Sequence, residues 1–389
     1  MAVESALQTP AARPGYPRAF RQRVLMTADT VGGVWQYALE LSRALIAEGH
    51  EVVLATMGAM PDRGQRLEAA AVSGLALYPS AYKLLWMPDC WRDVRAAGDW
   101  LLNLAAAVQP TVVHLNDFGH GDLPWKAPTV LVAHSCVMSW WRAVHGAPPP
   151  AAWRRYRECV SAALKAADLV VAPSDAMRRG LRQNYGMQVA ARVILNGRSG
   201  EEGSGARSKA EYIFSAGRIG DEAKNIAALG AVAGRMPWPV CIAGTGQQAD
   251  GAPVEFKDAH MLGRLATGQV RQWLARAPIY ALPARYEPFG LSILEAALAR
   301  CALVLGDIDS LREIWGDAAV FVDPNDHDAL EHALRRLIDD RGERERYAAR
   351  AHARAQRYTP AAMAAQYAAA YAQLTAEQAS EGAALKRAG

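Results

Sequence analysis

The sequence has few cysteines, no long apolar run and little net charge, and each absence narrows the class of protein. None of its five cysteines stands in a Cys-x-x-Cys spacing, so neither a disulfide framework nor a structural zinc site is indicated. No stretch approaches the roughly 18 consecutive apolar residues that favour a membrane span. A formal charge of +4 on 389 residues argues against general nucleic-acid binding. These absences predict a soluble protein of a reducing, cytoplasmic compartment.

The length and composition predict two domains. A chain of 389 residues with 51% hydrophobic content is too long for one ordinary core. A stretch with four glycines, from Asn196 to Gly205, reads as the boundary. The predicted parts are a disordered tail without a signal peptide at 1–20, a first domain at 21–196 that also receives a helix at 360–376, a second domain at 206–358, and a flexible tail at 377–389.

Both halves alternate strand-like and helix-like segments, which predicts an α/β protein with two parallel, doubly wound sheets. Helices are expected at 34–48, 89–108, 151–166, 224–235, 267–276 and 291–298. Strands are expected at 23–28, 51–57, 74–78, 111–115, 129–133, 169–172 and 192–195, then at 211–216, 239–243, 259–262, 279–282 and 302–305.

Ligands bind such sheets beyond the carboxyl ends of the strands, so residues directly after each strand are site candidates. Gly32 and Gly33 follow the first strand and open a helix, which lets backbone approach a ligand closely. A tight turn without a ligand is the alternative. His134 follows another apolar run, where its imidazole could meet a sugar hydroxyl, and a structural histidine is the alternative there.

Two cations follow the first strand of the second half. Arg218 and Lys224 lie in the segment Ala216–Asn225, where both side chains can reach one crevice. Paired cations suit a diphosphate leaving group, whose charge grows as a glycosidic bond breaks. A solvated loop with two surface cations is the alternative.

Two carboxylates stand eight positions apart around the predicted start of a helix. Pro288 cannot lie inside a helix, so Glu287 precedes the helix and Glu295 lies on it. The amides of Phe289, Gly290 and Leu291 then lie near the helix N-terminus, which attracts a phosphate. This arrangement suits a nucleotide sugar, with one carboxylate for sugar hydroxyls and the other for the ribose diol.

Together these motifs resemble the retaining glycosyltransferases of family 4. The most specific element is the E-x7-E signature, matched by Glu287 and Glu295. The supporting matches are Gly32-Gly33, Pro173 to Met177, Asn196-Gly197, and Gly217-Arg218 with Lys224.

The resemblance implies a GT-B fold, in which two Rossmann-like domains face each other across a cleft and a C-terminal helix crosses back to the N-terminal domain. It implies that Arg218 and Lys224 bind the donor diphosphate, that Glu287 contacts the transferred sugar and that Glu295 binds the ribose hydroxyls. His134 matches a family histidine near the C6 hydroxyl of that sugar. The expected reaction moves a hexose from a UDP- or GDP-linked donor to a hydroxyl of a glycan, glycolipid or small metabolite, with retention.

No cofactor or metal is expected besides the donor. The Asp307-Ile308-Asp309 triplet spells a D-x-D pattern that other glycosyltransferases use for a metal, and we interpret it as coincidence, with Asp309 capping a helix. Cationic side chains would take the place of the metal in this family.

Several alternatives stay open. Glu287 and Glu295 could be the acid and base of a glycoside hydrolase, or the chain could be a binding protein without turnover. The segments Tyr82 to Trp91 and Ser139 to His145 interrupt the regular pattern and are expected to be irregular loops. Their tryptophans, Trp86, Trp91, Trp140 and Trp141, could line an acceptor pocket or fill the core, whereas Trp100 and Trp125 are expected in the core. The loop around Trp86, or the basic cluster at Arg154, Arg155 and Arg157, could touch the inner face of a membrane weakly.

Overall fold

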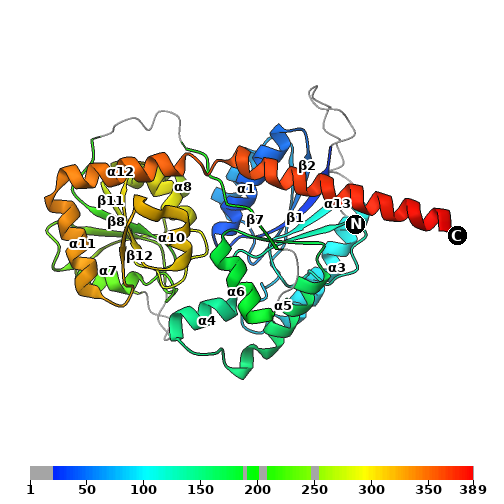
Figure 1. Ribbon diagram of the computed structural model, residues 1–389, viewed down its shortest axis with the longest axis horizontal. Coiled ribbons are helices and arrows are strands. Elements are labelled where there is room, and N and C mark those ends of the chain that lie inside the picture. Colours follow the sequence, from blue (N-terminus) through cyan, green and yellow to red (C-terminus); the bar gives the residue numbers. More distant parts are fainter. Residues whose placement is uncertain (1–20, 187–190, 201–207, 247–253, 389) are drawn as a thin grey trace. The chain divides into compact units, whose positions relative to one another are not determined.

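The computed structural model describes residues 21–186, 191–200, 208–246 and 254–388 and contains two parallel sheets (Figure 1). The tail predicted at 1–20 lies outside the described residues. The first sheet has the strand order β3-β2-β1-β4-β5-β6-β7, and the second has the order β10-β9-β8-β11-β12-β13. In both sheets the order reverses beside the first strand, as in doubly wound folds.

The strands lie close to their predicted positions. Those of the first sheet are β1 (Arg23–Asp29), β2 (Glu51–Met57), β3 (Leu75–Pro79), β4 (Val112–Leu115), β5 (Thr129–Val132), β6 (Leu169–Ala172) and β7 (Ala191–Val193). Those of the second are β8 (Ile213–Ala216), β9 (Val240–Ala243), β10 (His260–Gly263), β11 (Ile279–Leu282), β12 (Ala302–Gly306) and β13 (Val320–Val322). The last of these strands was not predicted, because its three residues are too few to stand out as an apolar run.

Helices connect the strands throughout. They are α1 (Gly33–Ala47), α2 (Arg63–Ala70), α3 (Trp91–Val108), α4 (Val137–His145), α5 (Arg154–Ala166), α6 (Asp175–Tyr185), α7 (Ile226–Ala233), α8 (Thr267–Arg276), α9 (Leu291–Leu298), α10 (Asp309–Trp315), α11 (His327–Asp339), α12 (Arg341–Ala355) and α13 (Pro360–Ala388). Short 3-10 turns occupy Ala151–Trp153 and Gly316–Ala318.

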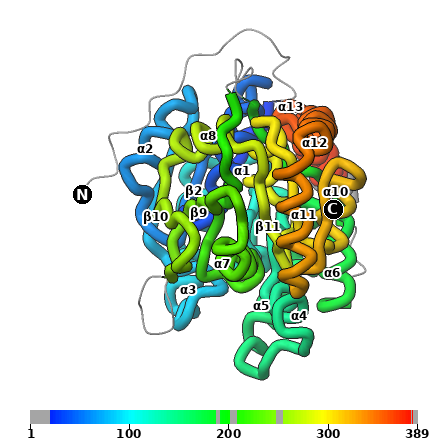
Figure 2. The backbone as a smooth tube through the Cα atoms, turned by 90° about the vertical axis from the view of Figure 1, so that its left-hand side faces the viewer, coloured from blue at the N-terminus to red at the C-terminus, as the bar shows by residue number. Residues whose placement is uncertain are grey.

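The second sheet is covered on both faces. Figure 1 shows β8, β11 and β12 between α8 and α12 on one side and α7 and α11 on the other, and Figure 2 shows α7 and α11 side by side. The strands β9, β11 and β12 are buried along their whole length. Continuous burial of this kind explains why these strands read in the sequence as unbroken apolar runs rather than as alternating patterns.

Helix α4 corrects one expectation. The sequence predicts an irregular loop for Ser139 to His145, because the apolar pattern is interrupted there, whereas the structure has a helix from Val137 to His145. The helix ends at Gly146, which adopts a left-handed conformation with φ of 64°. A glycine at this position is a common helix stop, and it was the available signal for the helix.

Contacts divide the chain into two compact units. The first unit comprises Met1–Leu131, Ala166–Asp168 and Ala364–Gly389, and the second comprises Val132–Lys165 and Leu169–Met363. The domain boundary expected near Asn196 stays a prediction. The charged residues of the predicted donor site all lie in the second unit, whereas Gly32 and Gly33 lie in the first.

The C-terminal helix α13 returns to the first sheet, as expected. Its apolar residues Met363, Tyr367, Tyr371 and Leu374 repeat every three or four positions and are buried. The helix continues to Ala388, beyond the predicted end at 376, because the added residues are rich in alanine and other helix formers. The flexibility predicted for 377–389 stays a prediction.

A buried polar cluster joins α13 to β4 within the first unit. The Nδ1 atom of His114 lies 2.6 Å from the Tyr371 hydroxyl, and its Nε2 atom lies 3.2 Å from Oδ1 of Asn116. Because Asn116 donates its amide to the Thr27 carbonyl at 2.6 Å, its oxygen faces the imidazole. This assigns the proton of the neutral ring to Nε2, with Nδ1 accepting from tyrosine. Burial lowers the pKa of His114 to about 3.

The lowered pKa of His114 makes stability depend on pH. As pH falls from 6.5 towards 3, the unfolded chain takes up a proton that the folded chain refuses, so stability is lost as pH falls. We expect His114 to contribute about 2 kcal/mol to the loss of unfolding free energy between pH 7.5 and pH 5. Urea unfolding at pH 7.5 and at pH 5 measures this loss of unfolding free energy. His114→Gln should show a weaker pH dependence, and the exposed control His260→Gln should keep the wild-type one. An unchanged dependence in His114→Gln contradicts the assignment.

None of the described helices is long and apolar enough to cross a membrane. Trp100 and Trp125 are partly buried and pack against a core cluster of the first unit, as expected. Trp86 is 41% exposed, and contact of its loop with a membrane surface stays a prediction. The arginines of α5 include Arg154, which pairs loosely with Glu158 at 3.9 Å in an exposed helix turn.

Candidate active site

The two predicted cations lie on one loop, Gly217–Asn225, which joins β8 to α7 and is called the cation loop below. Within it, Nη2 of Arg218 lies 2.7 Å from Oδ2 of Asp221, and the Lys224 amide donates to the Asp221 carbonyl at 2.9 Å. Asn225 ends the loop in a left-handed conformation with φ of 55°. Its side-chain amide donates to the carbonyls of Pro283 and Pro324, at 2.9 and 2.7 Å. The loop is therefore shaped by its own polar residues and anchored to two neighbouring turns.

A close backbone approach fixes the other side of the cation loop. Gly244 follows β9 with φ of 137°, and a Cβ atom there would lie 1.9 Å from the Gly217 carbonyl oxygen. The Ile219 amide donates to the Thr245 carbonyl at 3.1 Å. Any larger residue at 244 would push the cation loop away. The rest of the glycine-rich turn that begins at Gly244 lies, from Gln247, outside the described residues.

Lys224 and Glu287 form an ion pair. Nζ of Lys224 lies 2.6 Å from Oε2 of Glu287, and the side chains are 20% and 11% exposed. Glu287 belongs to the turn between β11 and α9, whose Arg285 amide donates to the Ala223 carbonyl at 2.8 Å. The Ser310 hydroxyl donates to the Glu287 carbonyl at 2.6 Å. Cation and carboxylate are thus held by rigid backbone on both sides, in a position that still reaches solvent.

The helix start predicted between the two carboxylates is present. Helix α9 begins at Leu291 and is preceded by Gly290, whose φ of 90° favours glycine. Phe289 is buried, and its ring lies edge-on to Tyr358. The first amides of α9 have no partner within the helix and carry its positive dipole end. Along the chain from Glu287 to Glu295, only the positions from Leu291 onward are helical. The helix therefore contributes about 6 Å to the distance between the two carboxylates.

Glu295 has a partner that the sequence analysis missed. Nη2 of Arg198 lies 2.5 Å from Oε1 of Glu295, and their side chains are 2% and 18% exposed. Arg198 stands among glycines, in the stretch expected to be the domain boundary. It lies in an irregular segment beyond the end of β7 at Val193, so no local pattern marked it as the partner of Glu295.

Asp221 is a second residue that the sequence analysis did not single out. Its Oδ2 accepts from Arg218, and its Oδ1 accepts from the indole nitrogen of Trp140 at 2.9 Å. Trp140 therefore contacts the cation loop through its polar edge. Its ring and that of Trp141 both lie against His145, with centroid distances of 5.5 and 4.3 Å.

The remaining predicted residues are placed as follows. His134 lies two positions after β5 and is partly buried. Gly32 is the exposed N-cap of α1, and its amide donates to Oδ1 of Asp29 at 2.9 Å, which makes a tight turn. Gly33 is the first residue of α1 and is also exposed.

The D-x-D triplet is engaged in ion pairs. Arg312 binds the Asp307 carboxylate and holds its pKa below the usual range. Asp309 pairs with Arg179 at 3.3 Å. Asp309 is the first residue of α10 rather than its cap, which is Ile308, so the capping expectation was wrong by one position. Among the described residues, no three His, Cys, Asp or Glu side chains gather closely enough to hold a metal ion.

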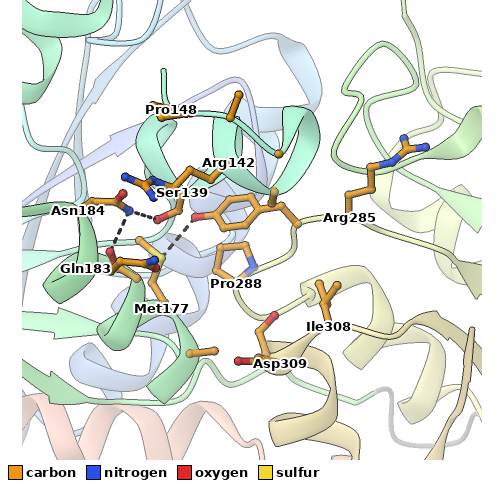
Figure 3. A pocket seen from close by; sticks show the side chains of 17 residues that line it. Ser139, Arg142, Pro148, Met177, Gln183, Asn184, Arg285, Pro288, Ile308 and Asp309 are labelled. Carbon is orange, nitrogen blue, oxygen red and sulfur yellow. Dashed lines mark hydrogen bonds between the residues drawn. The ribbon is translucent and has the colours of Figure 1, made fainter. Parts of the chain in front are cut away.

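A pocket of about 450 Å³ lies beside the Glu287 turn within the second unit (Figure 3). Tyr286 and Pro288 line it, together with residues of α4 and α6 and the start of α10. Asn184 donates to the Ser139 hydroxyl at 2.9 Å on its wall. Trp140 and Trp141 are not among its lining residues. The Glu287 carboxylate is not among them either, so the pocket adjoins the turn rather than the ion pair.

Two sequence profiles together match most of the chain. Residues 31–199 match Glycosyltransferase Family 4, and residues 201–354 match Glycosyl transferases group 1. The chain belongs to the family 4 glycosyltransferases. A glycogen synthase of Mycobacterium tuberculosis is 28% identical over 370 residues, which span 85% of this chain and 87% of that protein. An O-antigen chain mannosyltransferase B of Escherichia coli is 45% identical over 67 residues, 17% of this chain and 18% of that one.

Two solved structures show the fold. The sucrose-phosphate synthase of Thermosynechococcus elongatus superposes with a TM-score of 0.74 at 18% identity, covering 92% of this chain and all (100%) of that one. The HepE protein of Anabaena, in complex with UDP and glucose, gives a TM-score of 0.70 at 16% identity over 91% of this chain and 100% of that one. The fold is therefore the two-domain, Rossmann-like GT-B fold. The enzyme is a glycosyltransferase of the hexosyltransferase class, and the glycoside hydrolase alternative is set aside.

Proposed function

We propose that the enzyme transfers a hexose from a UDP- or GDP-linked donor to the hydroxyl of a glycan, glycolipid or small metabolite, with retention of the anomeric configuration. The observation that carries the proposal is the Lys224–Glu287 ion pair at 2.6 Å, which joins the loop that bears Arg218 to the turn before α9. This cluster offers a cation, a carboxylate and backbone amides to one ligand. The UDP and glucose bound by HepE, and the sugar products named for the other relatives, agree with a nucleotide-sugar donor.

Each residue has a proposed role. Arg218, Lys224 and the amides of Phe289 to Leu291 bind the diphosphate, whose charge grows as the bond to the sugar breaks. Glu287 accepts hydrogen bonds from hydroxyls of the transferred sugar, and Glu295 from the ribose diol. His134 contacts the C6 hydroxyl of the sugar, and Gly32 and Gly33 let the first unit's backbone approach the substrates. Because binding already orders the two substrates, their loss of translational and rotational entropy no longer adds to the barrier of the chemical step.

The reaction is proposed to occur on one face of the sugar. The bond between C1 and the diphosphate oxygen breaks, the acceptor oxygen bonds to C1, and the acceptor proton passes to the departing phosphate oxygen. Glu287 and Glu295 act as positioning ligands here rather than as acid and base, and each has its own cationic partner. Trapping of a covalent glycosyl-enzyme intermediate would contradict this route.

Metal ions are proposed to be dispensable, since Arg218 and Lys224 would carry the charge that a divalent cation carries elsewhere. We therefore expect the initial rate to stay within about twofold of the untreated enzyme after EDTA treatment. Loss of activity that manganese restores would contradict the expectation, and Asp307 and Asp309 would then be the candidate metal ligands.

A two-stage screen tests the proposed function. Thermal shift with UDP, GDP and ADP should raise the melting temperature for one of them, because a ligand at 100 times its Kd stabilises by about 2.7 kcal/mol. The corresponding sugar nucleotides are then tested for hydrolysis without an acceptor. Binding without hydrolysis of any donor would favour the non-catalytic alternative. Release of sugar from a glycoside that lacks a nucleotide would revive the hydrolase.

A further inference from the structure

Arg198 is almost fully buried, yet it lies against a residue of the proposed donor site. Its side chain is 2% exposed, and Nη2 lies 2.5 Å from Oε1 of Glu295. Its backbone amide donates to the Tyr358 carbonyl at 3.0 Å, which fixes the position of its main chain. A Cβ atom at nearby Gly200 would touch the Leu298 side chain at 3.6 Å, so this segment comes close to the last residue of α9. Arg198 therefore reaches Glu295 from an anchored segment.

Burial of a guanidinium is costly unless an anion compensates it, and arginine keeps its charge at any ordinary pH. This cost falls at a residue whose side chain contacts Glu295. The contact is an ion pair between one guanidinium nitrogen and one carboxylate oxygen, and neither Nε nor Nη2 makes a hydrogen bond of good geometry with any of the described residues. A buried positive charge this close to Oε1 holds that oxygen on the side of the guanidinium and so limits the rotation of the carboxylate. Without such a partner, a glutamate loses rotamer freedom when it binds a ligand, and this entropy loss weakens binding.

We propose that Arg198 is a positioning residue that holds the Glu295 carboxylate in the orientation in which it accepts hydrogen bonds from the ribose hydroxyls of the donor. A carboxylate accepts about four hydrogen bonds, so a contact at Oε1 leaves acceptor capacity for a diol. Glu295 is 18% exposed, which leaves part of its side chain accessible. The inference rests on the proposed assignment of Glu295 to the ribose and adds the residue that makes that assignment work.

A purely structural bridge is the competing explanation, since removal of a buried ion-pair partner destabilises a protein in any case. The two explanations differ in what they predict for the sugar of the nucleotide. A structural role affects all ligands alike. A positioning role affects ligands with a ribose diol and spares ligands that lack one hydroxyl.

The experiment is calorimetric titration of the whole chain with UDP and 2′-deoxy-UDP, and with GDP and 2′-deoxy-GDP. Wild type should bind one ribonucleotide about 10 to 100 times more tightly than its deoxy counterpart, the value expected for a hydrogen bond to a charged group. Arg198→Met keeps the length of the side chain and should reduce this preference to less than about threefold, mainly by weakening ribonucleotide binding.

Two further variants complete the design. Arg198→Lys keeps the charge without the fork and should show an intermediate preference, and it serves if Arg198→Met does not fold. Arg354→Met removes a partly buried arginine whose guanidinium contacts the carbonyls of Glu313 and Ile314, so it should lower stability and keep the wild-type preference.

The outcomes separate the inference from the function on which it rests. If Arg198→Met, or Arg198→Lys where the former does not fold, keeps the full wild-type preference, the positioning role is overturned while the donor site stands. If wild type binds a nucleoside diphosphate without a ribose preference, the assignment of Glu295 and this inference both fail. If wild type binds neither UDP nor GDP, the proposed donors fail as well.

Discussion

Replacing Lys224 with methionine is expected to lower kcat on the order of a thousand-fold, which is the effect of removing one preorganised charge from a developing anion. Lys224 is 20% exposed and lies 2.6 Å from Glu287, so its ammonium is held in place before the donor arrives. A charge that is already oriented costs no reorganisation during the reaction. Initial rates of donor hydrolysis, measured at saturating donor, give the change in kcat.

Two controls show whether the effect belongs to the site. Lys209→Met removes a lysine that donates to the carbonyls of Ala277 and Ala299 at 2.8 and 2.7 Å, and it should affect stability more than kcat. In a double-mutant cycle, Lys224→Met with Glu287→Gln should cost little more than either change alone, since both serve one bound donor. Near-normal turnover in both single variants would sink the site assignment.

Replacing Arg218 with alanine is expected to lower kcat/KM on the order of a hundred-fold. The smaller effect follows from its geometry, because Arg218 is 53% exposed and is tied to Asp221 at 2.7 Å on a loop whose backbone is fixed independently. Loss of this charge weakens binding of the donor diphosphate, so KM should rise. It also weakens stabilisation of the departing diphosphate, so kcat should fall. Full progress curves over a range of donor concentrations separate the two.

The control for Arg218→Ala is Arg341→Ala. Arg341 also pairs with a carboxylate, that of Glu345 at 2.7 Å, but on the exposed surface of α12. Its removal should leave the rate and the donor KM unchanged. Equal losses in both variants would mean that Arg218 acts through general surface charge, and raised ionic strength would then reproduce the effect.

The fold could be predicted well from the sequence where local pattern decides structure. The strand Ile279–Leu282 was expected at those residues, because a fully buried parallel strand is an unbroken apolar run bounded by proline and polar residues. The start of α9 followed from Pro288 and Gly290. Helix α4 was missed because polar residues interrupt its apolar pattern, although Gly146 marks its end. The strand Val320–Val322 was missed because three residues are too few to form a recognisable apolar run.

The site could be predicted in part for the same reason. The spacing of Glu287 and Glu295 is local, and it pointed to a helix start with a carboxylate on either side. Lys224 lies 63 positions from Glu287, so no local pattern predicted their ion pair, and only the family resemblance placed both residues at the donor. The pairing of Arg198 with Glu295 depends on how the chain comes close to α9, and no local pattern encodes that path.

The most direct measurement is time-resolved proton NMR of the enzyme with an α-linked UDP- or GDP-hexose, at an enzyme concentration that makes turnover faster than mutarotation. The account predicts release of the nucleoside diphosphate together with the α-anomer of the sugar first, and loss of both signals in Lys224→Met. Initial appearance of the β-anomer, or turnover that Lys224→Met leaves intact, would contradict it.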